Sequence, residues 1–170
     1  PSRRSPLPTS DVMARRDGDG FVRCQCGHAH WGLHGAAGLL VVRTDTAEPS
    51  VLLQLRAEWT HGGGTWALPG GARDSHEDVV TAAMREAEEE VGVDSSRLDV
   101  RKIFADDHGN WRYDTVIAFA QDDAGIYAAN HETSGFEWVP LPLVSSYQLH
   151  PGLAAHWTAI AELVRKELAI

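Results

Sequence analysis

The sequence predicts a single mixed α+β domain. Strand-like stretches alternate with two helix-like stretches from about Trp31 onward, and the 170 residues, 43% of them hydrophobic, suffice for one buried core. Residues 1–20 are rich in basic residues, Pro, Ser and Gly, contain no apolar run of signal-peptide length, and are expected to form a flexible leader. Residues 21–170 are therefore the predicted domain.

Short apolar stretches rich in β-branched and aromatic residues predict the strands. Two glycine-containing breaks, at residues 62–64 and 69–71, separate some of them and predict loops. A polar turn is expected at residues 106–110. The predicted strands cover residues 35–42, 51–55, 98–104, 113–120 and 136–139, with a short apolar piece, TWAL, at residues 65–68.

The first predicted helix begins near Ser75, which with Asp78 resembles a capping box, and it ends at Gly92. Its apolar positions recur at helical spacing and form one stripe. They are Val80, Ala83, Met84, Ala87 and Val91.

A final helix is expected to begin at Pro151, and Arg165 and Lys166 favour its C-terminal end. Its apolar positions are Leu153, Trp157, Ile160, Val164 and Leu168.

The net charge of −9 argues against binding to long nucleic acid, because such binding relies on basic patches. A small anionic ligand stays compatible with this charge, since a bound metal ion can reverse the local sign. No stretch is long and apolar enough for a membrane span. Two cysteines do not make a disulfide framework, so a reducing cytoplasm is the simplest expected location.

The segment CQCGHAH places Cys24, Cys26, His28 and His30 at alternate positions. One interpretation is a zinc site, and the other is an ordinary N-terminal strand. Structural zinc usually takes cysteines two to four residues apart and histidines three to five apart, so the spacing favours the strand.

Three glutamates of the first predicted helix converge on one side. With about 100° of rotation per residue, Glu86, Glu89 and Glu90 fall within an arc of roughly 100°, whereas Glu88 points away. Like charges at this spacing destabilise a helix, and its C-terminal end disfavours anions. Two explanations stay balanced on these residues alone: a solvated face partly neutralised by Arg85, or a site for a divalent cation.

The segment from Gly71 to Val93 resembles the Nudix box, G-x(5)-E-x(7)-R-E-U-x-E-E-x-G-U, where U is aliphatic. The aliphatic sites hold Ala87 and Val93. The fixed positions are Gly71, Glu77, Arg85, Glu86, Glu89, Glu90 and Gly92. The likeness extends over about residues 35–139, including WALPGG before the box and the first strand, GAAGLLVV.

This resemblance implies a Nudix-type α/β/α sandwich around a mixed β-sheet, and a hydrolase of phosphoanhydrides that uses Mg²⁺ or Mn²⁺. It implies that Glu86, Glu89 and Glu90 are metal ligands, that Arg85 orients the carboxylates, and that Glu77 supports the loop or an additional metal ion. In some MutT-type members a glutamate six residues before a tryptophan completes the site. Glu132 stands six residues before Trp138 and is expected to be a ligand or a base, so that the catalytic set is Glu89, Glu132 and Arg85. Glu137 is expected to lie on the surface.

The resemblance also suggests a substrate site. Arg56 stands where MutT-type enzymes carry an arginine that contacts the nucleotide, and its forked donors suit phosphate. Gly70, Gly71, His61 and Tyr113 complete the expected substrate-binding set. Trp59, Trp111 and His150 could line a base pocket or belong to the core, and Trp66, Trp138 and Trp157 are assigned to the core.

The expected activity is hydrolysis of a nucleoside triphosphate such as 8-oxo-dGTP or 8-oxo-GTP by a monomer or homodimer. Two features support this expectation. The sequence around the box resembles that of MutT-type enzymes, and the additional motifs of NADH and coenzyme A pyrophosphatases are absent. A hydrolase of ADP-ribose or dinucleoside polyphosphates, for which Tyr113 speaks, and a non-catalytic Nudix-fold nucleotide sensor are the alternatives.

Overall fold

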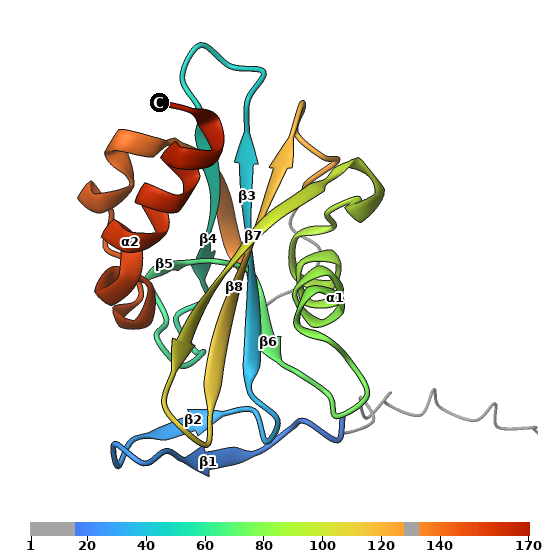
Figure 1. Cartoon of the computed structure of the whole chain (residues 1–170), viewed down its shortest axis with the longest axis vertical. Coiled ribbons are helices and arrows are strands. Elements are labelled where there is room, and N and C mark those ends of the chain that lie inside the picture. Colours follow the sequence, from blue (N-terminus) through green and yellow to red (C-terminus); the bar gives the residue numbers. More distant parts are fainter. Residues whose placement is uncertain (1–15, 128–132) are drawn as a thin grey trace, which may run out of the picture.

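A central sheet lies between two helices in the computed structural model, which describes residues 16–127 and 133–170 (Figure 1). The helices are α1 (Val79–Val91) and α2 (Pro151–Leu168). Two short 3₁₀ helices cover Ser95–Arg97 and Leu141–Ser146. The strands of the sheet are β3 (Ala36–Arg43), β4 (Ser50–Arg56), β5 (Trp66–Ala67), β6 (Gly70–Ala72), β7 (Asp99–Asp107), β8 (Arg112–Ala120) and β9 (Thr133–Pro140).

The sheet is mixed. Its order is β5-β4-β3-β8-β7, with β6 pairing β3 and β9 pairing β4. Strands β3 and β8 run parallel, and the other pairs in this sheet are antiparallel. The predicted α/β/α sandwich around a mixed sheet is confirmed.

Alternation along β3 explains the two layers. Leu40 and Val42 belong to the core that packs against α2, whereas Leu39 and Val41 belong to the core against α1. Successive side chains of a strand point to opposite faces, so a strand buried on both faces appears in the sequence as a continuous apolar run.

Helix α1 begins later than the capping pattern predicts. Its N-cap is Asp78, whose Oδ1 accepts a hydrogen bond of 2.7 Å from the Thr81 amide. Ser75 lies before the helix, and its amide and hydroxyl both donate to the carboxylate of Asp17. The prediction of Ser75 as the start of the helix is therefore wrong. Gly92 ends the helix as predicted, in the left-handed region with φ of 65°.

The buried stripe of α1 is rotated slightly from the predicted one. Ala82 joins Ala83, Ala87 and Val91 in the core, while Val80 and Met84 are only partly buried. Helix α2 matches its prediction: Leu153, Trp157, Ile160 and Val164 are buried and Leu168 packs against them.

The N-terminal region forms a hairpin instead of one strand. Strand β1 (Phe21–Arg23) pairs antiparallel with β2 (Ala29–Trp31), and this small sheet lies beneath the turn that joins β7 and β8 (Figure 1). Residues 16–20, part of the predicted leader, are in contact with the domain, and Gly18 and Gly20 are buried. Residues 1–15 lie outside the described residues, so the predicted boundary stays a prediction for them.

None of the helices in the described parts of the chain is both long and apolar enough to cross a membrane.

Candidate active site

Glu90 is the most buried of the three convergent glutamates. It is 6% exposed, and its Oε2 accepts hydrogen bonds from Gln54 Nε2 at 2.9 Å and from the Gly70 amide at 3.1 Å. Burial raises the pKa of Glu90 to about 8, and the neighbouring Glu86 adds to this rise. Strand β4 and the start of β6 therefore fix one carboxylate of α1 in place.

Glu86 lies against the glycine break that precedes α1. A Cβ atom on Gly71 would lie 2.6 Å from Glu86 Cδ, so any larger residue here would displace the carboxylate from its position. Glu86 Oε1 accepts a hydrogen bond of 2.7 Å from Arg85 Nη1. Burial raises the pKa of Glu86 although Arg85 opposes the rise. The glycine is needed here for close approach of a charged side chain.

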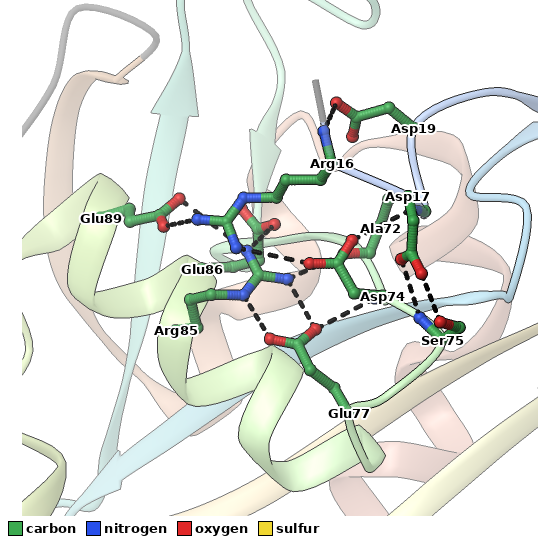
Figure 2. A network of polar contacts seen from close by, with 11 residues as sticks. Arg16, Asp17, Asp19, Ala72, Asp74, Ser75, Glu77, Arg85, Glu86 and Glu89 are labelled. Atoms are coloured by element: carbon green, nitrogen blue, oxygen red, sulfur yellow. Dashed lines mark hydrogen bonds and ion pairs between the residues drawn. The ribbon is translucent and has the colours of Figure 1, made fainter. Parts of the chain in front are cut away.

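Arg85 joins the helix to the loop before it (Figure 2). Its Nε and Nη2 donate to the two carboxylate oxygens of Glu77 at 2.6 and 2.9 Å, and Nη2 also donates to the Ala72 carbonyl at 3.1 Å. The Asp74 amide donates to Glu77 Oε2 at 3.0 Å. Arg85 holds the pKa of Glu77 below its usual value, so the pair is ionic. Arg85 thus contacts both Glu77 and Glu86, and the orienting and supporting roles of Arg85 and Glu77 stay predictions.

Glu89 is the most solvent-accessible of the three, with 40% of its side chain exposed. Its carboxylate accepts a hydrogen bond from Arg16, and Arg85 Nη1 lies 3.9 Å from its Oε2. Figure 2 shows the Arg16 side chain reaching between Glu89 and Asp74, whose Oδ2 is 3.5 Å from Arg16 Nη1. Arg16 thus neutralises part of the charge that the helix presents to solvent.

The residues present fit a hard divalent cation. Glu86, Glu89 and Glu90 offer carboxylate oxygens only, which is the donor type that Mg²⁺ prefers. The raised pKa values of Glu86 and Glu90 show that water and the surrounding groups compensate their charge incompletely. Glu88 is exposed and carries no part of this cluster, as the helical spacing predicts. Their role as metal ligands stays a prediction.

Arg56 and Tyr113 lie near enough to Glu90 to interact with it electrostatically. Tyr113 has its hydroxyl against the glycines, since a Cβ atom on Gly70 would lie 3.0 Å from it. Burial raises the pKa of Tyr113, Glu90 raises it further, and Arg56 counteracts the rise. The Tyr113 hydroxyl is therefore subject to opposing electrostatic effects from Glu90 and Arg56.

Arg56 is held by the glycine-rich loop. Its Nε donates to the His61 carbonyl at 2.8 Å. The His61 ring is exposed, and its centroid lies 6.4 Å from that of His150. Burial lowers the pKa of His150, and Arg56 and His61 lower it further. The fold thus brings the guanidinium of Arg56 and the imidazoles of His61 and His150 close to the glycine-rich loop. Contact of these groups with substrate stays a prediction.

The tryptophans differ in burial, which bears on whether they belong to the core or to a base pocket. Trp157 is buried, and Trp66 and Trp138 pack partly buried against the two cores, as predicted. Trp59 is 71% exposed. Trp111 is buried near the β1–β2 hairpin, where its ring stacks on His30, so it belongs to a small separate core.

Two glutamates outside the box have different outcomes. Glu132 lies outside the described residues, so its predicted role stays a prediction. Glu137 is exposed and accepts a hydrogen bond of 2.9 Å from the Tyr147 hydroxyl, as expected of a surface strand residue.

Sequence reasoning missed three residues that position the glutamates: Gln54, Arg16 and Asp74. Gln54 is 2% exposed within an apolar strand, and a lone amide in such a run is the one signal that could have drawn attention to it. Arg16 and Asp74 gave no local signal, because their contacts with each other and with the helix span long sequence separations.

Comparison with known proteins identifies the family. Residues 32–163 match the NUDIX domain. The chain is 45% identical over 161 residues to a Mycobacterium tuberculosis protein named "Putative 8-oxo-dGTP diphosphatase 3", which covers 88% of this chain and 72% of that protein.

Solved structures agree as well. The crystal structure of the M. smegmatis Nudix hydrolase RenU superimposes with a TM-score of 0.81 at 42% identity, covering 88% of this chain and 96% of that one. A C. elegans Ap4A hydrolase shares the fold with a TM-score of 0.62 at 18% identity, over 78% and 98% of the two chains. The match over residues 32–163 includes the whole of α1 and its loop, and it shows that this chain belongs to the Nudix hydrolase family.

Proposed function

We propose that this enzyme hydrolyses a nucleoside triphosphate in a Mg²⁺-dependent reaction, with an oxidised guanine nucleotide such as 8-oxo-dGTP or 8-oxo-GTP as its substrate. The observation that carries the proposal is the convergence of Glu86, Glu89 and Glu90 beside the Gly70–Gly71 break, with Arg56 near enough to Glu90 to lower its pKa. The relative named for 8-oxo-dGTP, at 45% identity, supports the base assignment.

The roles of the side chains follow from their surroundings. Glu86, Glu89 and Glu90 would hold Mg²⁺ or Mn²⁺, which when bound supplies positive charge to the phosphate oxygens and favours attack by water. Gln54 and the Gly70 amide keep the Glu90 carboxylate oriented, and Arg85 does the same for Glu86. Their fixed positions lower the reorganisation needed during the reaction.

Proton transfer is assigned to Glu89 and Glu132. Glu89 has the most accessible carboxylate of the cluster and would accept a proton from the attacking water once Arg16 moves away from it. Glu132 is proposed as a second ligand or base. Arg56 would bind phosphate through its remaining guanidinium donors, since only its Nε is used by the His61 carbonyl.

A nucleotide panel tests this proposal. Purified protein with Mg²⁺ is assayed against 8-oxo-dGTP, 8-oxo-GTP, dGTP, ADP-ribose and a dinucleoside tetraphosphate, and the products are separated by ion-exchange chromatography. We expect kcat/KM for the oxidised triphosphates to exceed that for ADP-ribose by at least about tenfold. Release of pyrophosphate or of phosphate identifies the bond that is cleaved. Equal or faster turnover of ADP-ribose or the dinucleoside compound would overturn the substrate assignment.

The dinucleoside alternative has one specific observation in its favour, the Tyr113 hydroxyl beside Gly70. A nucleotide sensor is the outcome if the wild-type protein binds a nucleotide of the panel and hydrolyses none. We place the reaction in the cytoplasm, catalysed by a monomer or homodimer acting on a small nucleotide.

A further inference from the structure

A second group of potential metal ligands lies at the hairpin end of the molecule. Cys24 and Cys26 lie in the turn between β1 and β2, His30 lies on β2, and His108 lies in the turn after β7. One donor atom of each residue lies within 4.8 Å of the donor atoms of the other three. This set replaces His28 of the sequence pattern with a histidine 82 residues beyond Cys26.

His30 has a nitrogen atom that nothing in the described parts of the chain satisfies. Its Nε2 is buried and has no hydrogen-bond partner there. The ring is fixed in place by stacking on Trp111, with centroids 3.9 Å apart and an interplanar angle of 8°. Buried polar atoms are normally paired, so this nitrogen is suited to a ligand that the protein chain itself does not supply.

His108 is oriented toward the sulfur atoms. Its Nδ1 lies 3.2 Å from Cys26 Sγ, and its Nε2 lies 3.0 Å from Asp106 Oδ2. A carboxylate accepting from Nε2 places the proton there and leaves the Nδ1 lone pair directed at the cluster. Histidines that bind metals commonly have such a carboxylate partner on the other nitrogen. His28 Nδ1, 3.3 Å from Cys26 Sγ, can hydrogen-bond the same sulfur.

The sulfur atoms of Cys24 and Cys26 form a disulfide in the structure. Reduction by a dithiol transfers two electrons and two protons to this bond, gives two thiols, and converts the dithiol into its own disulfide. Binding of a divalent ion then releases the two thiol protons. The disulfide and the metal-bound form therefore exclude each other.

We propose that, in the reduced protein, Cys24, Cys26, His30 and His108 bind one Zn²⁺ ion. Two thiolates and two imidazoles are a donor set typical of structural zinc, whereas Mg²⁺ prefers the oxygen-only set of the glutamates. The ion would join the β1–β2 hairpin to the β7–β8 turn. The hairpin follows directly on residues 16–20, which contact the loop before α1, so the zinc site supports the segment that carries Arg16.

The test uses the full chain, reduced with a dithiol and then freed of reductant without oxygen, with two thiols per chain confirmed by a thiol reagent. Zn²⁺ binding is measured by competition with a chromogenic chelator, and Co²⁺ is used as a spectroscopic probe. We expect one Zn²⁺ per chain with a Kd of about a nanomolar or tighter, and thiolate-to-cobalt charge-transfer absorption. That absorption cannot arise from the glutamate cluster.

Variants assign the ligands. His108→Ala and His30→Ala should each weaken Zn²⁺ binding at least about tenfold, whereas His34→Ala, an exposed histidine outside the set, should leave it unchanged. His108 lies in a partly exposed turn, so its variant keeps the test valid if a variant of buried Cys24 fails to fold. Absence of Zn²⁺ binding by the folded protein with two free thiols would overturn the proposal. Unchanged affinity in both histidine variants would also overturn it.

Discussion

The ion pair between Glu77 and Arg85 should be the contact of the box that contributes most to stability. The substitution Glu77→Gln removes its charge while keeping its size. Glu77 is 8% exposed and accepts three hydrogen bonds, two from Arg85 and one from the Asp74 amide. Glutamine has only one acceptor oxygen, so its amide group would face at least one of these donors.

The magnitude follows from the loss of a buried partner. Removing one member of a buried ion pair typically costs about 3–5 kcal/mol. Arg85 keeps Glu86 as a second anionic partner at 2.7 Å, so the lower end applies and we expect a loss of about 3 kcal/mol. For a domain of this size that corresponds to a decrease in Tm of roughly 6–12 °C.

The free energy of unfolding is measured by urea denaturation of the metal-free protein, with Glu88→Gln as the matched control on the exposed side of α1. The control should stay within about 0.5 kcal/mol of wild type. Hydrolysis by Glu77→Gln should also fall, by roughly tenfold or more, because Arg85, no longer anchored by the Glu77 carboxylate, orients Glu86 less precisely. If Glu77→Gln is as stable as Glu88→Gln, the pair does not join the loop to the helix as described.

Three further changes test other parts of the site. Gly71→Ala should lower kcat at least about tenfold, because the added Cβ would displace Glu86, whereas Gly135→Ala, where a Cβ meets nothing within 4 Å, should retain kcat in the same assay. The folded-state pKa of Glu90, about 8, exceeds its ordinary value of 4.5, so its contribution to stability is full below pH 4.5 and is lost as the pH rises toward 8. Urea denaturation across that range, with chelator present, should show this decline in wild type and a shallower one in Glu90→Gln; equal slopes would contradict the assigned burial. Arg56→Ala should raise KM with a smaller effect on kcat, and initial-rate kinetics that show an unchanged KM would remove Arg56 from the substrate site.

The sequence predicted best the features that depend on local patterns, namely helical spacing and apolar runs. Helical spacing placed Glu86, Glu89 and Glu90 on one side and Glu88 on the other, and the structure has this division. Strands β3, β4 and β8 were predicted because residues buried on both faces of a sheet form continuous apolar runs. The start of α1 differs from its prediction, and Ser75 instead hydrogen-bonds with Asp17, 58 residues away in the sequence. The N-terminal strand is a hairpin, and β7 extends into the predicted turn.

The features that the sequence could not predict depend on contacts between distant residues. The partners of Glu90 come from β4 and β6, and the partner of Glu89 comes from residue 16. The segment with Cys24 and Cys26 is a second example. Its spacing alone favours a strand, and only the fold brings His108 close to it. Local sequence patterns indicate candidate site residues. The topology of the sheet determines which distant residues contact them.

The central claim is that the convergent glutamates, and not the acidic surface of the helix in general, carry out the hydrolysis. Its most direct test is to compare Glu89→Gln with Glu88→Gln, neighbours on α1 that are both exposed and that differ in whether they face the cluster. With saturating Mg²⁺ and the best nucleotide of the panel, kcat/KM of Glu89→Gln should fall at least about a hundredfold, while Glu88→Gln should stay within about twofold of wild type. Equal rates for the two variants would contradict the account.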